Sequence, residues 1–187
     1  MHAYRMHELI KQRGKDSVVN VSQRNSVYQT IERLLRTELI HIVETTQQEG
    51  RPERVVYQIT AVGRETLREW VLGMIADPVA EFPEFPAALA TIAVLPQAEA
   101  TERLVQRVQA LEQKLIASGT ALEQAVAMGI PRLFLIEDEY KRAIMRTEIQ
   151  WINSLIDDFR SGAITWNEEW LRQVALSFAA RSGTPTA

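Results

Sequence analysis

The sequence predicts a mainly α-helical protein with one β-hairpin near its start and long helices in its second half. A helical segment, two short apolar strands and another helix follow one another within residues 22–74. A Pro-rich stretch separates them from long segments with apolar residues at intervals of three and four. The first part has the order of a winged helix-turn-helix, and an α-helical dimerisation domain is expected after it.

The first two helices are expected at residues 2–14 and 22–40. Gly14 is a plausible C-cap of the first, and Ser22 or Asn25 can cap the second. Helical spacing predicts that one face of the second helix turns inward through Val27, Ile31, Leu34 and Leu35. The opposite face is polar and free to meet a partner.

The wing is predicted as two strands, residues 40–46 and 54–60, joined by a turn at 47–53. Gly50 and Pro52 break the apolar pattern there. Thr60 is expected to cap a helix that starts at residue 61, because its hydroxyl can accept the free N–H groups of the first turn. A charged turn is thereby held out on a hairpin.

Domain boundaries follow from proline and glycine. The predicted organisation is a winged helix over 1–76, a Pro-rich linker over 77–86, a helical domain over 87–180 and a disordered tail over 181–187. Within the helical domain, helices are expected at about 87–95, 98–128, 132–160 and 167–180.

The two longest predicted helices carry different apolar patterns. Residues 98–128 have a coiled-coil-like seam formed by Leu104, Val108, Leu111, Leu115, Leu122 and Ala125. The apolar stripe of 132–160 is wider, with one set at Leu133, Tyr140, Ile144, Trp151 and Leu155 and another at Ile136, Ile149, Ile152 and Ile156. Such a width indicates one side buried in the same chain and another in a second subunit.

Composition excludes several classes of protein. The chain has no Cys, which rules out disulfides and thiolate metal sites and suits the cytoplasm. No run approaches the roughly 20 apolar residues of a membrane span, and no apolar signal core is present at the start. Residues 1–64 carry 10 basic and 7 acidic side chains, whereas the remainder carries 11 and 17. The sign of this asymmetry favours attraction of phosphate to the first half.

The polar face of the second helix is the candidate DNA-reading surface. Ser26, Gln29 and Arg33 form its stripe, with Arg24 and Asn25 at the helix start. Arg can pair with guanine, and Asn or Gln with adenine, through two hydrogen bonds in the major groove. The alternative is an ordinary solvated helix face, and Arg33, late in the helix, could contact phosphate instead.

Three further residues are candidates for DNA contact. Tyr28 is either a phosphate ligand through its hydroxyl or a packed core residue. Arg51 and Arg54, in the wing, could reach phosphate or a narrow minor groove. The alternative for these two arginines is a solvated turn.

Aromatic residues of the second half could line an effector pocket between helices. They are Tyr140, Trp151, Trp166 and Trp170. Core or dimer packing is the competing interpretation. No metal site or cofactor is predicted, and no nucleophile–base pair or phosphate loop indicates an enzyme.

The stretches NSVYQTIERLLRTELI and GRPERVVYQITAVGRETLREWV resemble the PadR family of bacterial transcriptional regulators. The matching positions are Tyr28, Ile31, Leu34, Leu39, Ile40, Gly50, Arg51, Pro52, Tyr57, Ile59, Thr60, Gly63, Arg64, Leu67 and Trp70. They span about residues 1–75, and the second half is similar to the longer PadR subgroup. The resemblance implies a homodimer formed by the C-terminal helices on a palindromic operator, and repression relieved by a small, often aromatic effector.

Two features depart from the family pattern. Glu38 stands where the family usually has Gly, so a less sharply turned helix end is expected. Residues 1–4 are similar to a Leu-His-Gly-Tyr motif that normally follows an entire first helix, so the chain is expected to lack that helix. These departures leave a second interpretation open, in which the helical half is an interaction module and the winged helix binds DNA weakly or not at all.

Overall fold

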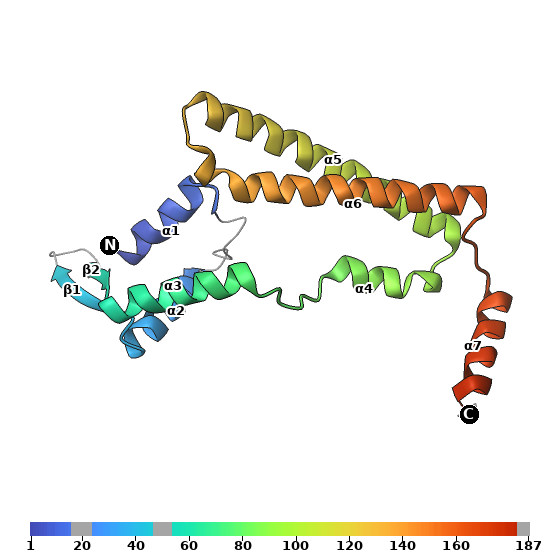
Figure 1. The fold of residues 1–187 in the computed structure, drawn as a ribbon, viewed down its shortest axis with the longest axis horizontal. Helices are drawn as coiled ribbons and strands as arrows, with labels where there is room; N and C mark the ends of the chain where they lie inside the picture. Colours follow the sequence, from blue (N-terminus) through green and yellow to red (C-terminus); the bar gives the residue numbers. More distant parts are fainter. Residues whose placement is uncertain (16–23, 47–53, 183–187) are drawn as a thin grey trace. The chain divides into compact units, whose positions relative to one another are not determined.

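The computed structural model describes residues 1–15, 24–46 and 54–182 and divides into two units. The first, Met1–Glu81, combines helices with a two-stranded antiparallel sheet, whereas the described part of the second, Phe82–Ala187, is helical (Figure 1). The predicted fold class, a mainly α winged helix followed by a helical region, is therefore confirmed.

The elements of the first unit follow the predicted order. They are α1 (Ala3–Gln12), α2 (Arg24–Arg36), β1 (Ile40–Thr46), β2 (Arg54–Ile59) and α3 (Ala61–Ala76). The strands pair from Ile40 opposite Ile59 to Thr46 opposite Arg54, with a bulge between Ile42 and Glu44. The predicted turn at 47–53 lies outside the described residues.

The start of the chain lies beside β2. The Met1 amino group donates to the Tyr57 carbonyl at 2.6 Å, and the Tyr57 N–H donates back to the Met1 carbonyl at 3.1 Å. The His2 ring nitrogen Nδ1 lies 3.1 Å from the Val55 carbonyl oxygen. These contacts fix the entry of α1 against the sheet, and Ala3 is buried.

The end of α2 corrects one expectation. Glu38 has φ of 57°, the left-handed conformation that glycine adopts readily. Its N–H donates to Leu35, and the N–H of Leu39 reaches back to Leu34, which is a Schellman arrangement. The helix end is thus sharply turned although Glu occupies the position, because these two bonds satisfy carbonyls that the helix leaves free.

Thr60 caps α3, as predicted. Its hydroxyl accepts the Gly63 N–H at 2.9 Å and lies 2.9 Å from the Glu38 carbonyl oxygen, to which it can donate. One side chain therefore joins the first turn of α3 to the junction between α2 and β1. This junction fixes how α2 is presented relative to the strands.

The second unit consists of helices joined by short turns. They are α4 (Glu84–Ala90), the 3-10 turn η2 (Ile92–Val94), α5 (Gln97–Ala127), the 3-10 turn η3 (Arg132–Phe134), α6 (Ile136–Ser161) and α7 (Glu168–Ser182). The helix expected at 87–95 is observed as α4, which begins and ends before the predicted residues. Pro86 fits the first turn of α4, where its missing N–H costs nothing, and the helix gives way at Thr91 to η2.

The last helix extends into the segment predicted as the tail. The helix α7 continues through Ser182, so it includes two residues expected to be disordered. Residues 183–187 lie outside the described part of the chain.

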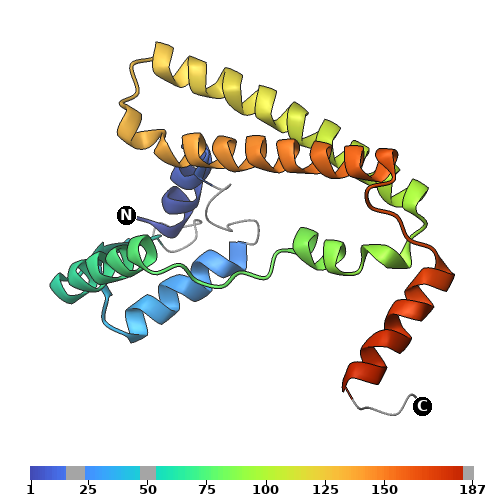
Figure 2. The ribbon, with the colours of Figure 1, turned by 45° about the vertical axis from the view of Figure 1, so that its right-hand side comes forward.

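Helices α5 and α6 run side by side in opposite directions and form the core of the second unit (Figures 1 and 2). The buried cluster comprises Ala100, Leu104, Val108 and Leu111 of α5 with Ile152, Ile156 and Phe159 of α6. The later seam positions, Leu115, Leu122 and Ala125, are only half-buried. The predicted seam is thus fully buried only in the first half of α5, where α6 presents its own apolar residues.

Polar side chains fasten this helical pair at two places. At the start of α5 and the end of α6, Gln97 donates to the Phe159 carbonyl at 2.8 Å, and the Trp166 indole donates to the Leu95 carbonyl at 3.0 Å. Further along, Arg142 of α6 donates to the Leu115 carbonyl and to the Ser118 hydroxyl. Each contact satisfies a polar group that burial would otherwise penalise.

Large apolar side chains also remain exposed in both units. On α3 they include Trp70, Met74 and Ile75, and on α6 they include Ile136, Tyr140, Ile144 and Trp151. Neither set forms a membrane span, since among the described residues no helix combines the length and the hydropathy needed to cross a bilayer.

Candidate nucleic-acid interface

The helix α2 is amphipathic, and its two faces are differently occupied. Ile31 is buried and Val27 is half-buried, which anchors one face in the first unit. Gln29 and Arg33, one turn apart, are exposed on the other face. Two members of the predicted reading stripe are therefore accessible to a partner.

Arg36 extends this exposed row and was missed in the sequence interpretation. It lies three residues beyond Arg33 and seven beyond Gln29, which is the spacing of one helix face. That spacing is visible in the sequence. Arg36 adds a second cation to the row, and phosphate contact is the chemistry best suited to a guanidinium at a helix end.

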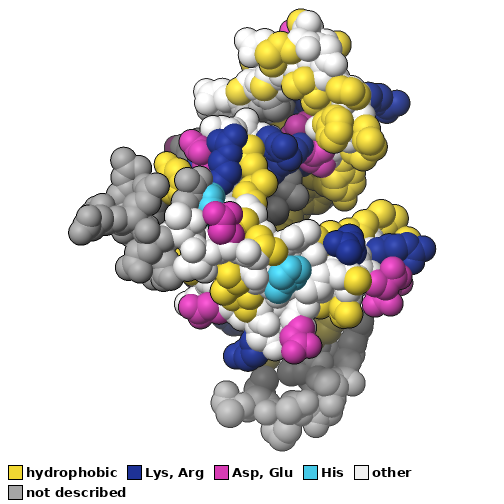
Figure 3. Space-filling view, turned by 90° about the vertical axis from the view of Figure 1, so that its left-hand side faces the viewer, with side chains coloured by type: hydrophobic (Ala, Val, Ile, Leu, Met, Phe, Trp, Pro, Cys, Tyr) yellow, Lys and Arg dark blue, Asp and Glu magenta, His cyan; other side chains and the backbone are white. Residues whose placement is uncertain are grey.

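The surface around α2 is not uniformly basic. Glu32 is exposed directly beside Arg33 in the chain, and Glu38 is exposed beyond the helix end. Figure 3 likewise shows basic and acidic side chains intermixed on the face that it presents. Phosphate attraction would therefore come from a few positioned cations rather than from a broad positive field.

Five of the predicted DNA contacts have side chains outside the described part of the structure. Arg24, Asn25 and Ser26 belong to the first turn of α2, and Arg54 starts β2 opposite Thr46, but the described part of these four is the backbone alone. Arg51 lies outside the described residues.

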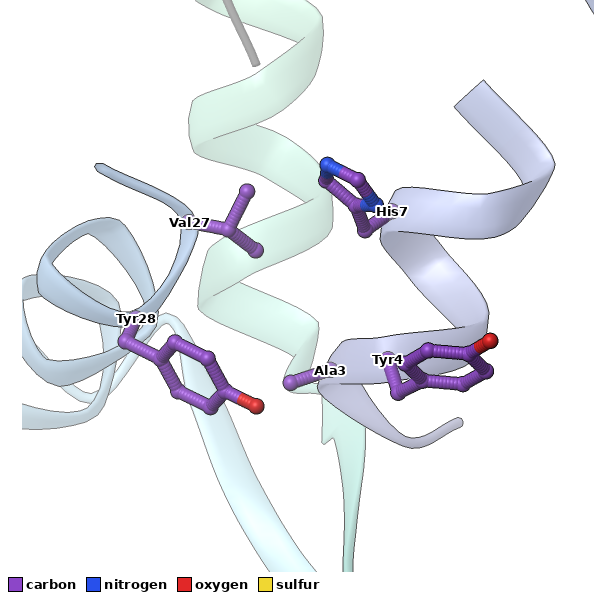
Figure 4. Close-up of a pocket in the computed structure, with 5 residues that line it drawn as sticks. All are labelled: Ala3, Tyr4, His7, Val27 and Tyr28. Carbon is purple, nitrogen blue, oxygen red and sulfur yellow. The ribbon is translucent and has the colours of Figure 1, made fainter. Parts of the chain in front are cut away.

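Tyr28 lies at the junction between α1 and α2. It lines a small cleft of about 40 Å³ with Ala3, Tyr4, His7 and Val27. Figure 4 shows the Tyr28 hydroxyl end directed toward Ala3, while His7 and Val27 face one another across the gap. With 51% of Tyr28 exposed, the ring is positioned by α1 and its hydroxyl remains reachable. A cleft of this size holds a water molecule rather than an organic ligand.

The four aromatic residues proposed for an effector pocket occupy different environments. Trp166 is half-buried and packs edge-on against Phe159, with ring centres 5.2 Å apart. Tyr140, Trp151 and Trp170 are about half-exposed or more. Trp166 thus belongs to the helical core, whereas the other three present their rings outward.

Metal chemistry is not indicated in the part of the chain that the structure describes. No group of three or more His, Cys, Asp or Glu side chains there could hold a metal ion. The pKa shifts that are resolved belong to one exposed ion pair. The hydrogen bond from Arg132 lowers the pKa of Glu139, and the same bond raises the pKa of Arg132.

No family model and no curated protein matches the chain. Solved structures do match its fold. Bacillus subtilis PadR in complex with operator DNA is 18% identical with a TM-score of 0.66, over 85% of this chain and 91% of that one. The Vibrio cholerae virulence activator AphA is 19% identical with a TM-score of 0.54, over 74% of this chain and 79% of that one.

A PadR-like transcriptional regulator from Bacillus cereus has 13% identity and a TM-score of 0.51, over 75% of this chain and 79% of that one. The chain therefore has the fold of PadR and PadR-like regulators. The fold that the sequence resemblance implied is confirmed, including its helical C-terminal region.

Proposed function

We propose that this protein is a sequence-specific DNA-binding regulator of transcription in which α2 enters the major groove. The observation that carries the proposal is the exposed row of Gln29 and Arg33 on a helix anchored through Ile31. The major groove, about 12 Å wide, admits one such helix. Bacillus subtilis PadR, which has a similar fold and is in complex with operator DNA, supports DNA as the partner, and the PadR-like regulator of Bacillus cereus favours a regulator over an enzyme.

The wing supplies the second proposed contact. Arg51 and Arg54 are expected to touch phosphate or the minor groove beside the site of α2, while Arg24, Asn25, Ser26 and Tyr28 complete the surface of the helix. The net charge of +3 over residues 1–64, from 10 basic and 7 acidic side chains, favours this half for phosphate. Such a regulator works in the cytoplasm, where bacterial DNA is found.

We further propose that the protein acts as a homodimer on a palindromic operator. The exposed stripe of α6, formed by Ile136, Tyr140, Ile144 and Trp151, supports a second copy as its partner. Ile144→Lys should then convert dimer to monomer in analytical ultracentrifugation, whereas Gln150→Lys, on an exposed position of the same helix, should not. A wild-type chain that sediments as a monomer at micromolar concentration would contradict the dimer.

Repression released by a small molecule is the regulatory mode that the family resemblance implies. We retain Tyr140, Trp151, Trp166 and Trp170 as aromatic candidates for contact with such an effector. If the rings in the dimer enclose a ligand, an aromatic effector should quench tryptophan emission saturably and weaken DNA binding.

The function is tested by mobility shift with DNA from upstream of the protein's own gene. Expected is a saturable complex that a scrambled duplex of the same length does not compete away. Its affinity should fall steeply with salt, because bound cations release counterions from DNA. Weak binding that is equal for both duplexes would contradict the proposal.

One observation favours a second candidate, a protein-interaction module whose winged helix does not hold DNA. The helix α3 exposes Trp70, Met74 and Ile75, an apolar surface suited to a protein partner. This candidate predicts no specific shift with upstream DNA and a stable complex with another protein. The same mobility-shift experiment therefore separates the two functions.

A further inference from the structure

A cavity of about 370 Å³ lies among α4, η2 and the first half of α5. Its size falls within the range of roughly 300–1,000 Å³ typical of small-molecule sites. None of the four aromatic residues named above lines it. The aliphatic part of its wall comprises Ala88, Leu89, Ile92, Val94, Leu95, Ala100 and Leu104.

Phe85, Thr91 and two arginines complete the wall, and the arginines differ in their partners. Arg107 is paired with Glu148, since its Nε and Nη2 lie 2.7 and 2.6 Å from Glu148 Oε1. Its guanidinium also stacks 3.7 Å from the centre of the Phe85 ring. Arg103 donates to the Gln106 side chain, and no carboxylate of the described residues pairs with it. The cavity therefore combines an apolar interior with one cation that lacks a counter-ion.

The chemistry of the wall defines the ligand class. A guanidinium without an acidic partner favours a carboxylate, since charge-assisted hydrogen bonds are the strong ones. The only aromatic ring among the lining residues, Phe85, has one face covered by Arg107, and the Thr91 hydroxyl donates to the Ala87 and Ala88 carbonyls of its own helix, so most of the remaining wall is aliphatic. We propose that this cavity binds a medium-chain aliphatic carboxylate, with its chain among Leu89, Ile92 and Leu104 and its carboxylate on Arg103.

The position of α4 gives such a ligand a route to regulation, a consequence that rests on the proposed DNA-binding function. The first unit ends at Glu81, and α4 begins at Glu84. No residue of α4 is fully buried, and the side chains of α4 that pack against the core of the second unit are Phe85 and Leu89, both partly buried. A ligand between α4 and α5 can therefore displace α4 while disturbing few contacts, and α4 leads directly into the connection to the winged helix. Ligand binding should weaken the complex with DNA.

Binding is measured first in the absence of DNA, with Trp166 as the reporter. Its indole donates to the Leu95 carbonyl, and Leu95 lines the cavity. In a full-length chain carrying Trp70→Phe, Trp151→Phe and Trp170→Phe, octanoate should shift the remaining emission saturably. Octanol, which has the same chain without the charge, should bind about tenfold more weakly.

Arg103→Gln should reduce octanoate affinity about tenfold and leave octanol affinity unchanged, because the variant removes the guanidinium and leaves the aliphatic wall intact. Arg146→Gln, an exposed position of α6 away from the cavity, is the matched control and should change neither. Arg103 is exposed, so this variant should fold normally. Equal affinity of wild type and Arg103→Gln for octanoate would overturn the proposal.

A second pair of variants tests the location. Ala88→Phe should fill the cavity and abolish binding, whereas Ala87→Phe, its exposed neighbour outside the wall, should not. If the Trp166 emission instead depends on protein concentration and ignores octanoate, a second copy of the chain occupies the cavity and the proposal fails. Preference for an aromatic carboxylate such as benzoate over octanoate would also overturn it.

The regulatory consequence is tested with the upstream duplex. Saturating octanoate should weaken its complex with wild type at least tenfold and leave that of Ala88→Phe unchanged. Octanoate binding without any effect on a specific DNA complex would overturn the regulatory half of the proposal. Octanoate binding by a chain that forms no specific DNA complex would remove the proposed function and leave the ligand site standing.

Discussion

The carbonyl oxygen of Leu39 lies so close to Gly63 that a Cβ on this residue would overlap it. Such an atom would also be 2.9 Å from the Leu39 carbonyl carbon and from Cγ1 of Ile59. Only glycine permits this approach of α3 to the junction between α2 and β1. Since Thr60 bonds to the same junction, the presentation of α2 depends on a backbone contact rather than on a large side chain.

Gly63→Ala should lower the free energy of unfolding by about 2–3 kcal/mol, because the obstacle is backbone, which cannot move aside as a flexible side chain can. Gly73→Ala is the matched control in the same helix. A Cβ there would come no closer than 3.9 Å to Asp77, so the variant should gain about 0.5–1 kcal/mol from helix propensity. Urea unfolding measures both, and equal changes in the two variants would contradict the role of Gly63.

Glu38→Gly should raise the free energy of unfolding by about 1 kcal/mol. Glu38 holds φ of 57°, where a Cβ costs roughly 1–2 kcal/mol, offset in part by the extra chain entropy that glycine loses on folding. Glu38→Ala removes the same carboxylate but keeps the Cβ, so it should change stability little. Thermal unfolding that shows the same gain for both variants would assign the effect to charge instead of conformation.

The exposed ion pair of Arg132 and Glu139 should be detectable as a lowered pKa of Glu139 in a pH titration. Hydrogen bonding from Arg132 lowers the pKa of Glu139, so Arg132→Gln should move the Glu139 titration to higher pH. A carboxylate with a lowered pKa in the folded state adds stability above its unfolded pKa and loses it as the pH falls through the folded value. Because both groups are open to solvent, the effect on unfolding should be small.

The titration is followed by NMR of the Glu139 carboxyl carbon, with Arg172→Gln on α7 as the control. An unchanged Glu139 titration in Arg132→Gln would show that the ion pair does not persist in solution.

The ion pair of Arg107 and Glu148 joins α5 to α6 and should contribute more than a surface pair. Its side chains are 39% and 24% exposed, compared with 65% and 63% for Arg172 and Glu169. Glu148→Gln should therefore cost about 1 kcal/mol of unfolding free energy, and Glu169→Gln less than about 0.5 kcal/mol. Urea unfolding of the two variants side by side would contradict this ranking if their midpoints moved equally.

Local rules were sufficient to predict the strands, the closing helix and its cap. Apolar residues followed by a turn mark β1, alternation of Val55, Tyr57 and Ile59 marks β2, and the hydroxyl of Thr60 needs only its own sequence neighbours to cap α3. The conformation of Glu38 was not predictable in the same way. Its φ follows from bonds that close the end of α2 and from Thr60, which is distant in sequence.

The same difference between features set by sequence neighbours and features set by distant residues applies to the candidate surfaces. Exposure of Gln29 and Arg33 follows from helical spacing around Ile31, so the sequence predicts it, and Arg36 could have been added on that rule. The cavity could not be predicted, because it depends on how α4 and η2 pack against α5. In the sequence, Arg103 is one ordinary cation of a long helix, and the aromatic residues predict a pocket elsewhere.

Two variants of the proposed DNA surface should distinguish base recognition from phosphate contact. Gln29→Ala should change which base is preferred at one position of the operator, at a cost of about 1–3 kcal/mol for the original base, and keep the salt dependence. Arg51→Ala should weaken binding to every duplex alike and reduce the salt slope by about 1. Gln150→Ala, exposed on α6, should do neither. Mobility shifts on an operator and its single-base variants, repeated at several salt concentrations, measure both properties. If Gln29→Ala left the base preference unchanged while DNA still bound specifically, a different face of α2 would read the groove.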